Sequence, residues 1–190
     1  WAANHHSWWD PFTGTALARE LGLRSCVLML QDNLDRFRFA GAIGAFGTSH
    51  LRRGLSYLDD GRVLLVYPEG RLMPPGPLGP LAEGAAWYAL AARVPLYAVA
   101  CRVVMRGNVA AEAYLSFREV SSERPPATRD LVTRRLARTL DEELRSLDLS
   151  ISTSEPRLPL DGFSLVIRGR LSPDERIERR MRWLPKQLVR

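Results

Sequence analysis

The chain has 190 residues, of which 46% are hydrophobic and 25% are charged, with a formal net charge of +6. This length supports one domain with a sizeable core and leaves little room for a second full domain. The two cysteines, Cys26 and Cys101, stand apart inside apolar runs, a pattern that argues against a disulfide framework or a metal site. The positive charge favours anionic partners such as phosphorylated substrates and acidic lipid headgroups.

The first half of the chain alternates helix and strand signals. Asp10 followed by Pro11 predicts the N-cap and first residue of a helix, and Gly22 is a typical C-terminal signal for it. The apolar run over 63–67 is typical of a strand buried on both faces. In chain order, the predicted elements are a helix over 10–19, a strand over 24–30, a short helix over 33–39, a glycine-rich stretch over 41–47, a helix over 51–58 and the strand over 63–67.

The second half opens on the turn Pro68-Glu69-Gly70 and an irregular, proline-rich stretch over 73–80. Strands that alternate with helices predict a single-domain α/β fold. We expect a mixed, largely parallel sheet flanked by helices, with ligands near the carboxyl ends of its strands. The later predicted elements are a helix over 81–92, strands over 94–104 and 113–120, a linker over 121–127, a helix that Thr128 caps, a loose stretch over 150–161, a strand over 163–167 and a helix over 173–184.

The stretch NHHSWWDP, residues 4–11, holds the first residues suited to catalysis. The pKa of a histidine lies nearest neutrality, so His5 can take a proton from a hydroxyl at working pH. It does this well when a carboxylate fixes its tautomer and stabilises the charge it acquires, which is the role we assign to Asp10. We expect His5 in the loop before the helix and Asp10 at its first turn. The alternative is that Asp10 only caps the helix and His5 is a surface residue.

Three motifs follow in order: YPEGR over 67–71, EGAA over 83–86 and VPLYAV over 94–99. Together with NH-x4-D they resemble the glycerolipid acyltransferase family, the lysophosphatidic acid acyltransferase type in particular. Members of that family carry F-P-E-G-T-R, a small-residue helix that opens near K-G, and V-P-I-x-P-V. The resemblance covers residues 4–100, and its spacing selects His5, not His6, as the base. In the family a strand leads into the first motif, and we expect that strand to lie upstream of this sequence.

The family's acceptor-binding segment is usually G-x-F-x-x-x-R, and residues 44–50 hold its place here. His50 stands where an arginine is expected, and Arg71 follows Gly70 with no intervening threonine. Neutral histidine cannot hold phosphate by the charge-assisted fork of an arginine, so these departures weaken glycerol phosphate as the acceptor but not acyl transfer itself. The substrate-binding residues that the resemblance implies are Gly44, Phe46, His50, Arg52, Arg53, Pro68, Glu69, Gly70 and Arg71.

The resemblance implies an enzyme that moves a fatty acyl group from acyl-CoA or acyl carrier protein to a hydroxyl of a lysophospholipid such as 1-acylglycerol-3-phosphate. His5 would act as general base and Asp10 would orient it, without an acyl-enzyme, a cofactor or a metal. Two other functions stay open: acyl transfer to a different lipid or glycoside hydroxyl, and a non-catalytic lipid-binding relative. A nucleic-acid-binding module rests on charge alone, and no reader motif supports it.

Residues 1–149 are assigned to the acyltransferase domain, and residues 150–190 to a C-terminal extension with a strand and a basic amphipathic helix packed on the same domain. Ser172 and Glu175 form a capping box for that helix. Such a helix can lie on an anionic membrane surface, or its apolar side can pack on the domain. Trp8, Trp9 and Trp183 suit a membrane interface. The apolar side of the helix carries Ile177, Met181 and Leu184.

The most apolar stretch, residues 85–105, is interrupted by Arg93, Pro95 and Arg102. It therefore falls short of the ~18 uninterrupted apolar residues that a membrane-spanning helix needs. We expect a cytoplasmic protein that is peripheral on the inner face of the membrane. An N-terminal anchor upstream of the sequence is the alternative.

Overall fold

The structure, a computed structural model, describes residues 1–107, 109–120, 128–169, 171 and 173–181. Its strands are β1 (Ala2–Ala3), β2 (Ser25–Met29), β3 (Ala45–Gly47), β4 (Val63–Leu65), β5 (Tyr97–Val104) and β6 (Glu112–Glu119). They form two three-stranded sheets, ordered β3-β2-β4 and β1-β5-β6. All these pairings are parallel except that of β5 with β6. The predicted α/β class and largely parallel pairing are confirmed.

The two sheets meet where β4 ends beside β1. Ala2 and Val66 form a parallel bridge, Ala3 N donates to Val66 O at 2.9 Å, and Val66 N donates to Trp1 O at 2.9 Å. These bonds align the carboxyl ends of β1 and β4, so the segments that follow both strands emerge at one edge. β1 is a strand that leads into the NHHSWWDP loop, which corrects the expectation that this strand lay upstream of the sequence.

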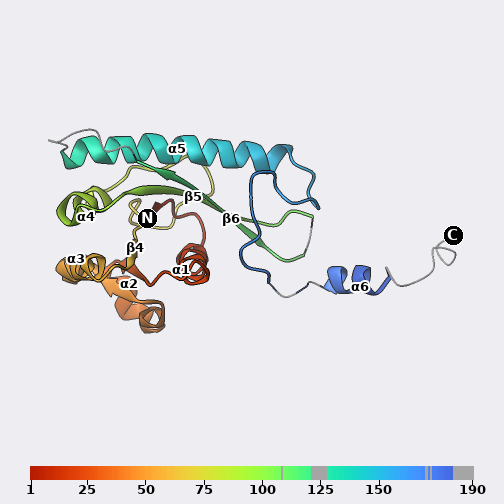
Figure 1. Cartoon of the computed structure of the whole chain (residues 1–190), viewed down its shortest axis with the longest axis horizontal. Helices are drawn as coiled ribbons and strands as arrows, with labels where there is room; N and C mark the ends of the chain where they lie inside the picture. Colours follow the sequence, from red (N-terminus) through yellow and green to blue (C-terminus); the bar gives the residue numbers. More distant parts are fainter. Residues whose placement is uncertain (108, 121–127, 170, 172, 182–190) are drawn as a thin grey trace.

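Helices cover both sides of the sheets, as Figure 1 shows. They are α1 (Asp10–Glu20), α2 (Gln31–Arg36), α3 (Leu51–Asp59), α4 (Gly84–Ala92), α5 (Arg129–Thr153) and α6 (Pro173–Met181), with the 3-10 helices η1 (Arg38–Ile43) and η2 (Thr48–His50). α5 packs along β5 and β6, whereas α1 packs on β2 and β4 on the opposite side. α6 lies apart from this layered body.

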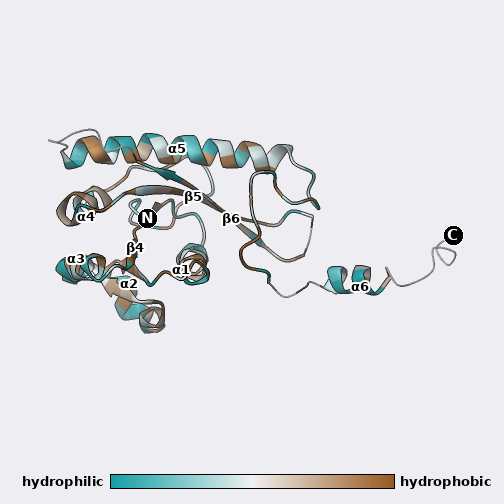
Figure 2. Ribbon diagram, in the orientation of Figure 1, coloured by the Kyte–Doolittle hydropathy of each residue, from teal (hydrophilic) through white to brown (hydrophobic). Residues whose placement is uncertain are grey.

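The long helix α5 supplies much of the core. Thr128 Oγ1 accepts a hydrogen bond from Leu131 N at 3.3 Å, which confirms the predicted N-cap. Hydrophobic and hydrophilic residues alternate along α5 (Figure 2). Full burial of one leucine stabilises a fold by about 1.5–3 kcal/mol. The leucines that α5 buries at helical spacing are Leu136, Leu140, Leu144 and Leu147.

Several element boundaries differ from those predicted. The glycine-rich stretch contains β3, because it pairs with β2. Phe46 is buried there, and a Cβ at Gly47 would overlap Gln31. α2 begins two residues earlier than predicted, and α4 begins at Gly84 instead of 81. α5 continues through Thr153, whose hydroxyl donates to Leu149 O at 2.8 Å, so the loose stretch begins later than predicted.

The strand predicted over 163–167 does not form. Leu165 is 71% exposed, and Val166 and Ile167 are largely exposed too, because none of the described strands pairs with this segment. Leu160, which precedes the segment, belongs to the hydrophobic core, and Phe163, the first residue of the segment, packs against that core. None of the helices in the described part of the chain is both long and apolar enough to cross a membrane.

Candidate active site

The loop that follows β1 is fixed to β5 by a buried asparagine. Asn4 Nδ2 donates to Cys101 O at 3.0 Å, and Asn4 Oδ1 accepts from Cys101 N at 2.7 Å. The side chain is fully buried, so both of its polar ends are satisfied by the main chain of a single residue. The sequence around Asn4 does not reveal this contact, since its partner lies almost a hundred residues away.

Asp10 organises the same loop from the start of α1. Its Oδ2 accepts from His6 N at 2.9 Å and from Ser7 N at 2.8 Å, and lies 3.1 Å from His5 Nδ1. The expected N-cap at Asp10 is wrong: the N-cap is Trp9, and the carboxylate binds the loop that precedes the helix. The positive end of the helix dipole favours the ionised carboxylate at this position.

The imidazole of His5 is fixed by two neighbours, Asp10 and Tyr67. A carboxylate accepts only, so Asp10 fixes the ring proton on Nδ1 and leaves the Nε2 lone pair to accept a proton. The ring packs on Tyr67 with their centroids 4.7 Å apart. Burial raises the pKa of Tyr67 well above its usual value, and the thiol of Cys101 and the carboxylate of Asp10 raise it further. The imidazole therefore packs against a phenol that is neutral.

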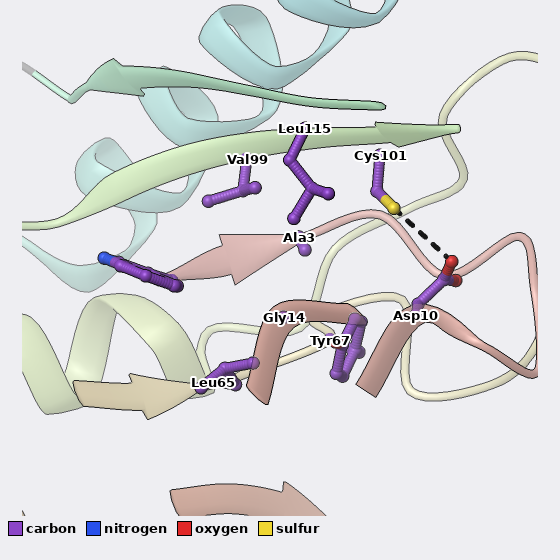
Figure 3. A pocket seen from close by; sticks show the side chains of 9 residues that line it. Ala3, Asp10, Gly14, Leu65, Tyr67, Val99, Cys101 and Leu115 are labelled. Atoms are coloured by element: carbon purple, nitrogen blue, oxygen red, sulfur yellow. Dashed lines mark hydrogen bonds between the residues drawn. The ribbon is translucent and has the colours of Figure 1, made fainter. Parts of the chain in front are cut away.

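Cys101 contacts the other oxygen of Asp10. Its Sγ donates to Asp10 Oδ1 at 3.6 Å, as the dashed line in Figure 3 shows. Burial, followed by the charge of Asp10, raises the pKa of this thiol far above its usual value, so it stays protonated and remains a donor. The sequence showed only a cysteine in an apolar run, and its role depends on the alignment of β5 with the loop.

Glu69 joins this loop to the turn after β4. Its Oε2 accepts from His5 N at 2.7 Å, and its Oε1 accepts from Gly79 N at 2.9 Å. His5 O in turn accepts from Met73 N at 2.7 Å. The carboxylate is fully buried, so Glu69 fixes the main chain of His5 and the proline-rich segment. Gly70 supports the turn with a φ of +69°, which few side chains tolerate.

A cavity of about 400 Å³ opens beside His5, between α1, β2, η1 and the turn after β4. Its wall is mostly apolar, and the guanidinium-bearing Arg71 stands on it with Pro68 and Gly70. The His5 imidazole thus faces a space that suits a hydrocarbon chain. The large apolar residues on the wall are Trp8, Phe12, Leu28, Leu30, Phe37, Phe39, Ile43, Leu51 and Leu72.

The residues predicted to bind the acceptor in the segment over 44–50 lie away from the cavity wall, unlike Pro68 and Gly70 of the turn after β4. Gly44 has a φ of +75° and closes η1, and Phe46 is buried in the core against Tyr57. His50 is exposed, with its Nδ1 2.9 Å from the Oγ of the neighbouring Ser49. None of these three residues lines the cavity.

The paired arginines of α3 also lie outside the cavity wall. Arg52 and Arg53 are exposed, and the guanidinium of Arg53 stacks 5.5 Å from the ring centroid of Tyr57. Of the nine substrate-binding residues implied by the resemblance, the structure brings only Pro68, Gly70 and Arg71 to the cavity, and Glu69 to its support.

Comparison with known proteins gives the class of the chain. A family model described as Acyltransferase matches residues 1–102, more than half of the chain. The fold is similar to a crystal structure of the 1-acyl-sn-glycerophosphate (LPA) acyltransferase PlsC from Thermotoga maritima. The TM-score is 0.57 at 15% identity, over 77% of this chain and 65% of that chain. Comparison with curated proteins finds no match.

The chain therefore belongs to the acyltransferase family, and the predicted resemblance to the glycerolipid acyltransferases is confirmed. The family model gives the class as acyltransferase, and the structural match shows that the fold is like that of the Thermotoga maritima enzyme. The matched range, residues 1–102, contains both the His5–Asp10 pair and the turn that carries Glu69.

Proposed function

We propose that the chain transfers a fatty acyl group from acyl-CoA or acyl carrier protein to the hydroxyl of a lysophospholipid such as 1-acylglycerol-3-phosphate. The observation that carries this proposal is the His5 Nδ1–Asp10 Oδ2 contact of 3.1 Å at the wall of an apolar cavity. The protein of similar fold from Thermotoga maritima is an LPA acyltransferase, which supports the same acceptor class here.

In this reaction His5 Nε2 takes the proton of the acceptor hydroxyl as its oxygen attacks the thioester carbonyl. Asp10 stabilises the imidazolium that forms. The tetrahedral intermediate then expels the thiolate, which receives the proton from His5 and leaves as the free thiol. The ester bond forms as the thioester bond breaks, and the imidazole returns to its starting state.

The cavity would hold the acyl chain. Each methylene that leaves water for an apolar wall contributes about 0.8 kcal/mol, so a mostly apolar cavity favours long chains. Arg71 is the cation on this wall, and it would bind the acceptor phosphate by charge-assisted hydrogen bonds. A phosphate-free lipid or glycoside hydroxyl is the second candidate acceptor, because His50 replaces the family arginine and lies off the cavity wall.

The same face would meet the membrane, on the cytoplasmic side. Trp8 is 48% exposed and Trp9 58% exposed, and Phe39 near them is 56% exposed. Trp8 and Phe39 also line the cavity, so an acyl chain could pass from lipid to the site along aromatic surface. On α6, Ile177 and Met181 are exposed as well, whereas Trp183 and Leu184 lie outside the described residues.

Vesicle co-sedimentation tests this membrane face. We expect Trp8→Ser combined with Trp9→Ser to weaken binding to vesicles that contain anionic lipid. The matched control is Leu149→Ser, which removes an equally exposed apolar side chain from α5 on the far side of the body. Equal binding by the wild type and the double variant would place the membrane contact elsewhere.

Thiol release from a long-chain acyl-CoA or acyl carrier protein, with a panel of acceptors, tests the activity. Release by the wild type that requires lysophosphatidate, and that falls by about 10³-fold in His5→Ala, is the expected result. Release that requires His5 with a phosphate-free acceptor would favour the second candidate. No release with any donor and acceptor from folded protein would favour the non-catalytic lipid-binding relative.

A further inference from the structure

One buried polar cluster beside the active site has no part in the mechanism above. Arg102 interrupts the apolar strand β5 and is 7% exposed. Its Nε donates to Asp148 Oδ1 at 2.6 Å and its Nη2 to Asp148 Oδ2 at 2.8 Å, a two-pronged contact with α5. A buried guanidinium without a partner destabilises the fold. The partner of its third nitrogen therefore matters.

That third nitrogen, Nη1, contacts Nδ1 of His6. A guanidinium can only donate, so Nδ1 must accept and the single proton of the neutral ring lies on Nε2. Burial, followed by the charge of Arg102, lowers the pKa of His6 and keeps the ring neutral. Its Nε2 is buried, has no hydrogen-bond partner among the described residues and lies 3.7 Å from Glu69 Oε1.

We propose that His6 is a positioning residue for acyl transfer: it connects the Arg102–Asp148 ion pair to Glu69 and thereby holds the main chain of His5 in place. This inference rests on the proposed function. The family spacing selects His5 over His6 as the base, and that spacing carries no sign of this second role for His6. Arg102 was visible in the sequence as a charge inside an apolar run, but its partners were not.

The connection runs through a carboxylate whose charge is fully buried. Glu69 accepts main-chain N–H groups from His5 and Gly79, and Nε2 of His6 lies 3.7 Å from the Oε1 that accepts from Gly79. Loss of the His6 ring would leave Nη1 of Arg102 without its acceptor and would remove a favourable dipole from Glu69. The main chain of the base would then be held less firmly, which lowers kcat more than it alters substrate binding.

Two substitutions test the two ring nitrogens of His6 one at a time. His6→Asn places an oxygen near the position of Nδ1 and nothing near Nε2, and we expect kcat to fall about ten-fold with KM for the acyl donor within two-fold. His6→Gln restores an N–H near Nε2, and we expect it to recover most of that loss. Arg138→Asn, which alters an exposed residue of α5 outside the site, is the matched control. Wild-type kcat in folded His6→Asn would overturn the inference.

Nitrogen NMR of the imidazole rings supplies a readout that does not depend on activity. The wild type should show His6 as the Nε2–H tautomer, titrating below the usual histidine range, and Arg102→Met should abolish the tautomer preference and raise the pKa. A wild-type ring with its proton on Nδ1 would overturn the inference. If His6→Asn does not fold, Asp148→Asn weakens the anchor of Arg102 from a half-exposed site and should lower kcat about three-fold.

The two proposals fail in different ways. An inactive wild type with His6 in the expected tautomer would reject the proposed function and keep the buried contact. An active wild type whose His6 variants match it in kcat would keep acyl transfer and reject the positioning role.

Discussion

The loop over residues 4–10 and the segment over 44–53 were both assigned to the active site by the same family resemblance, and the structure treats them differently. In the loop, buried polar contacts reach to distant elements, from Asn4 to β5 and from Glu69 to His5. In the segment, Phe46 belongs to the core, and the exposed ring of His50 contacts its neighbour Ser49. Residues that match a family motif are held in the site where contacts from several elements fix them. A match of sequence alone does not bring a residue to the site.

Removal of the carboxylate from the loop should have the largest effect. Asp10→Asn replaces an acceptor that orders His5 Nδ1 and two main-chain N–H groups, so we expect kcat to fall about 10³- to 10⁴-fold. The measurement is steady-state thiol release. Ser7→Ala is the matched control, because it keeps the main-chain bond to Asp10 and removes only a hydroxyl that accepts from Trp9 N. Similar losses in both variants would show that the loop itself, not the carboxylate, is what matters.

In the segment over 44–53, we expect a substitution of Phe46 to lower the free energy of unfolding and not the activity. Phe46→Ala empties a buried site against Tyr57, and we expect the free energy of unfolding to fall by about 3–5 kcal/mol. Below its unfolding transition, the variant should keep the substrate KM of the wild type. Urea denaturation gives the first quantity and initial-rate kinetics the second. A specific rise in KM without loss of stability would return Phe46 to the substrate site.

Arg71 separates the two acceptor classes. Because it is the arginine on the cavity wall, Arg71→Ala should raise KM for a phosphorylated acceptor about ten-fold, the loss of one charge-assisted contact. KM for a phosphate-free acceptor should not change. Arg19→Ala, an exposed arginine near the end of α1, controls for the change in net charge. An equal effect of both variants would indicate long-range charge instead of direct binding.

The smallest effect is expected at His50. Its exposed ring contacts Ser49 and lies off the cavity wall, so His50→Ala should change KM for any acceptor by less than about two-fold, the range of exposed polar contacts. Initial rates at several acceptor concentrations give this value. A rise beyond about five-fold would mean that His50 itself contacts the acceptor, and the contrast between the two segments would no longer hold.

Local sequence signals predicted most elements because they depend on near neighbours. The Thr128 cap, the leucine spacing of α5 and the apolar run of β4 each settle a structure within a few residues. The predictions failed where distant partners decide the outcome. β3 forms although it is rich in glycine, because β2 pairs with it, and residues 163–167 form no strand despite their apolar content.

The sequence by itself determined the class of fold, the family and the His5–Asp10 pair, since motif order and hydrophobic pattern are carried by the residues alone. The tertiary structure decided how that pair is held. Cys101 and Asn4 meet because β5 lies beside β1, and Arg102 reaches His6 because α5 supplies Asp148 across the layer. Such contacts satisfy buried polar groups across long separations, and no local spacing in the chain encodes them.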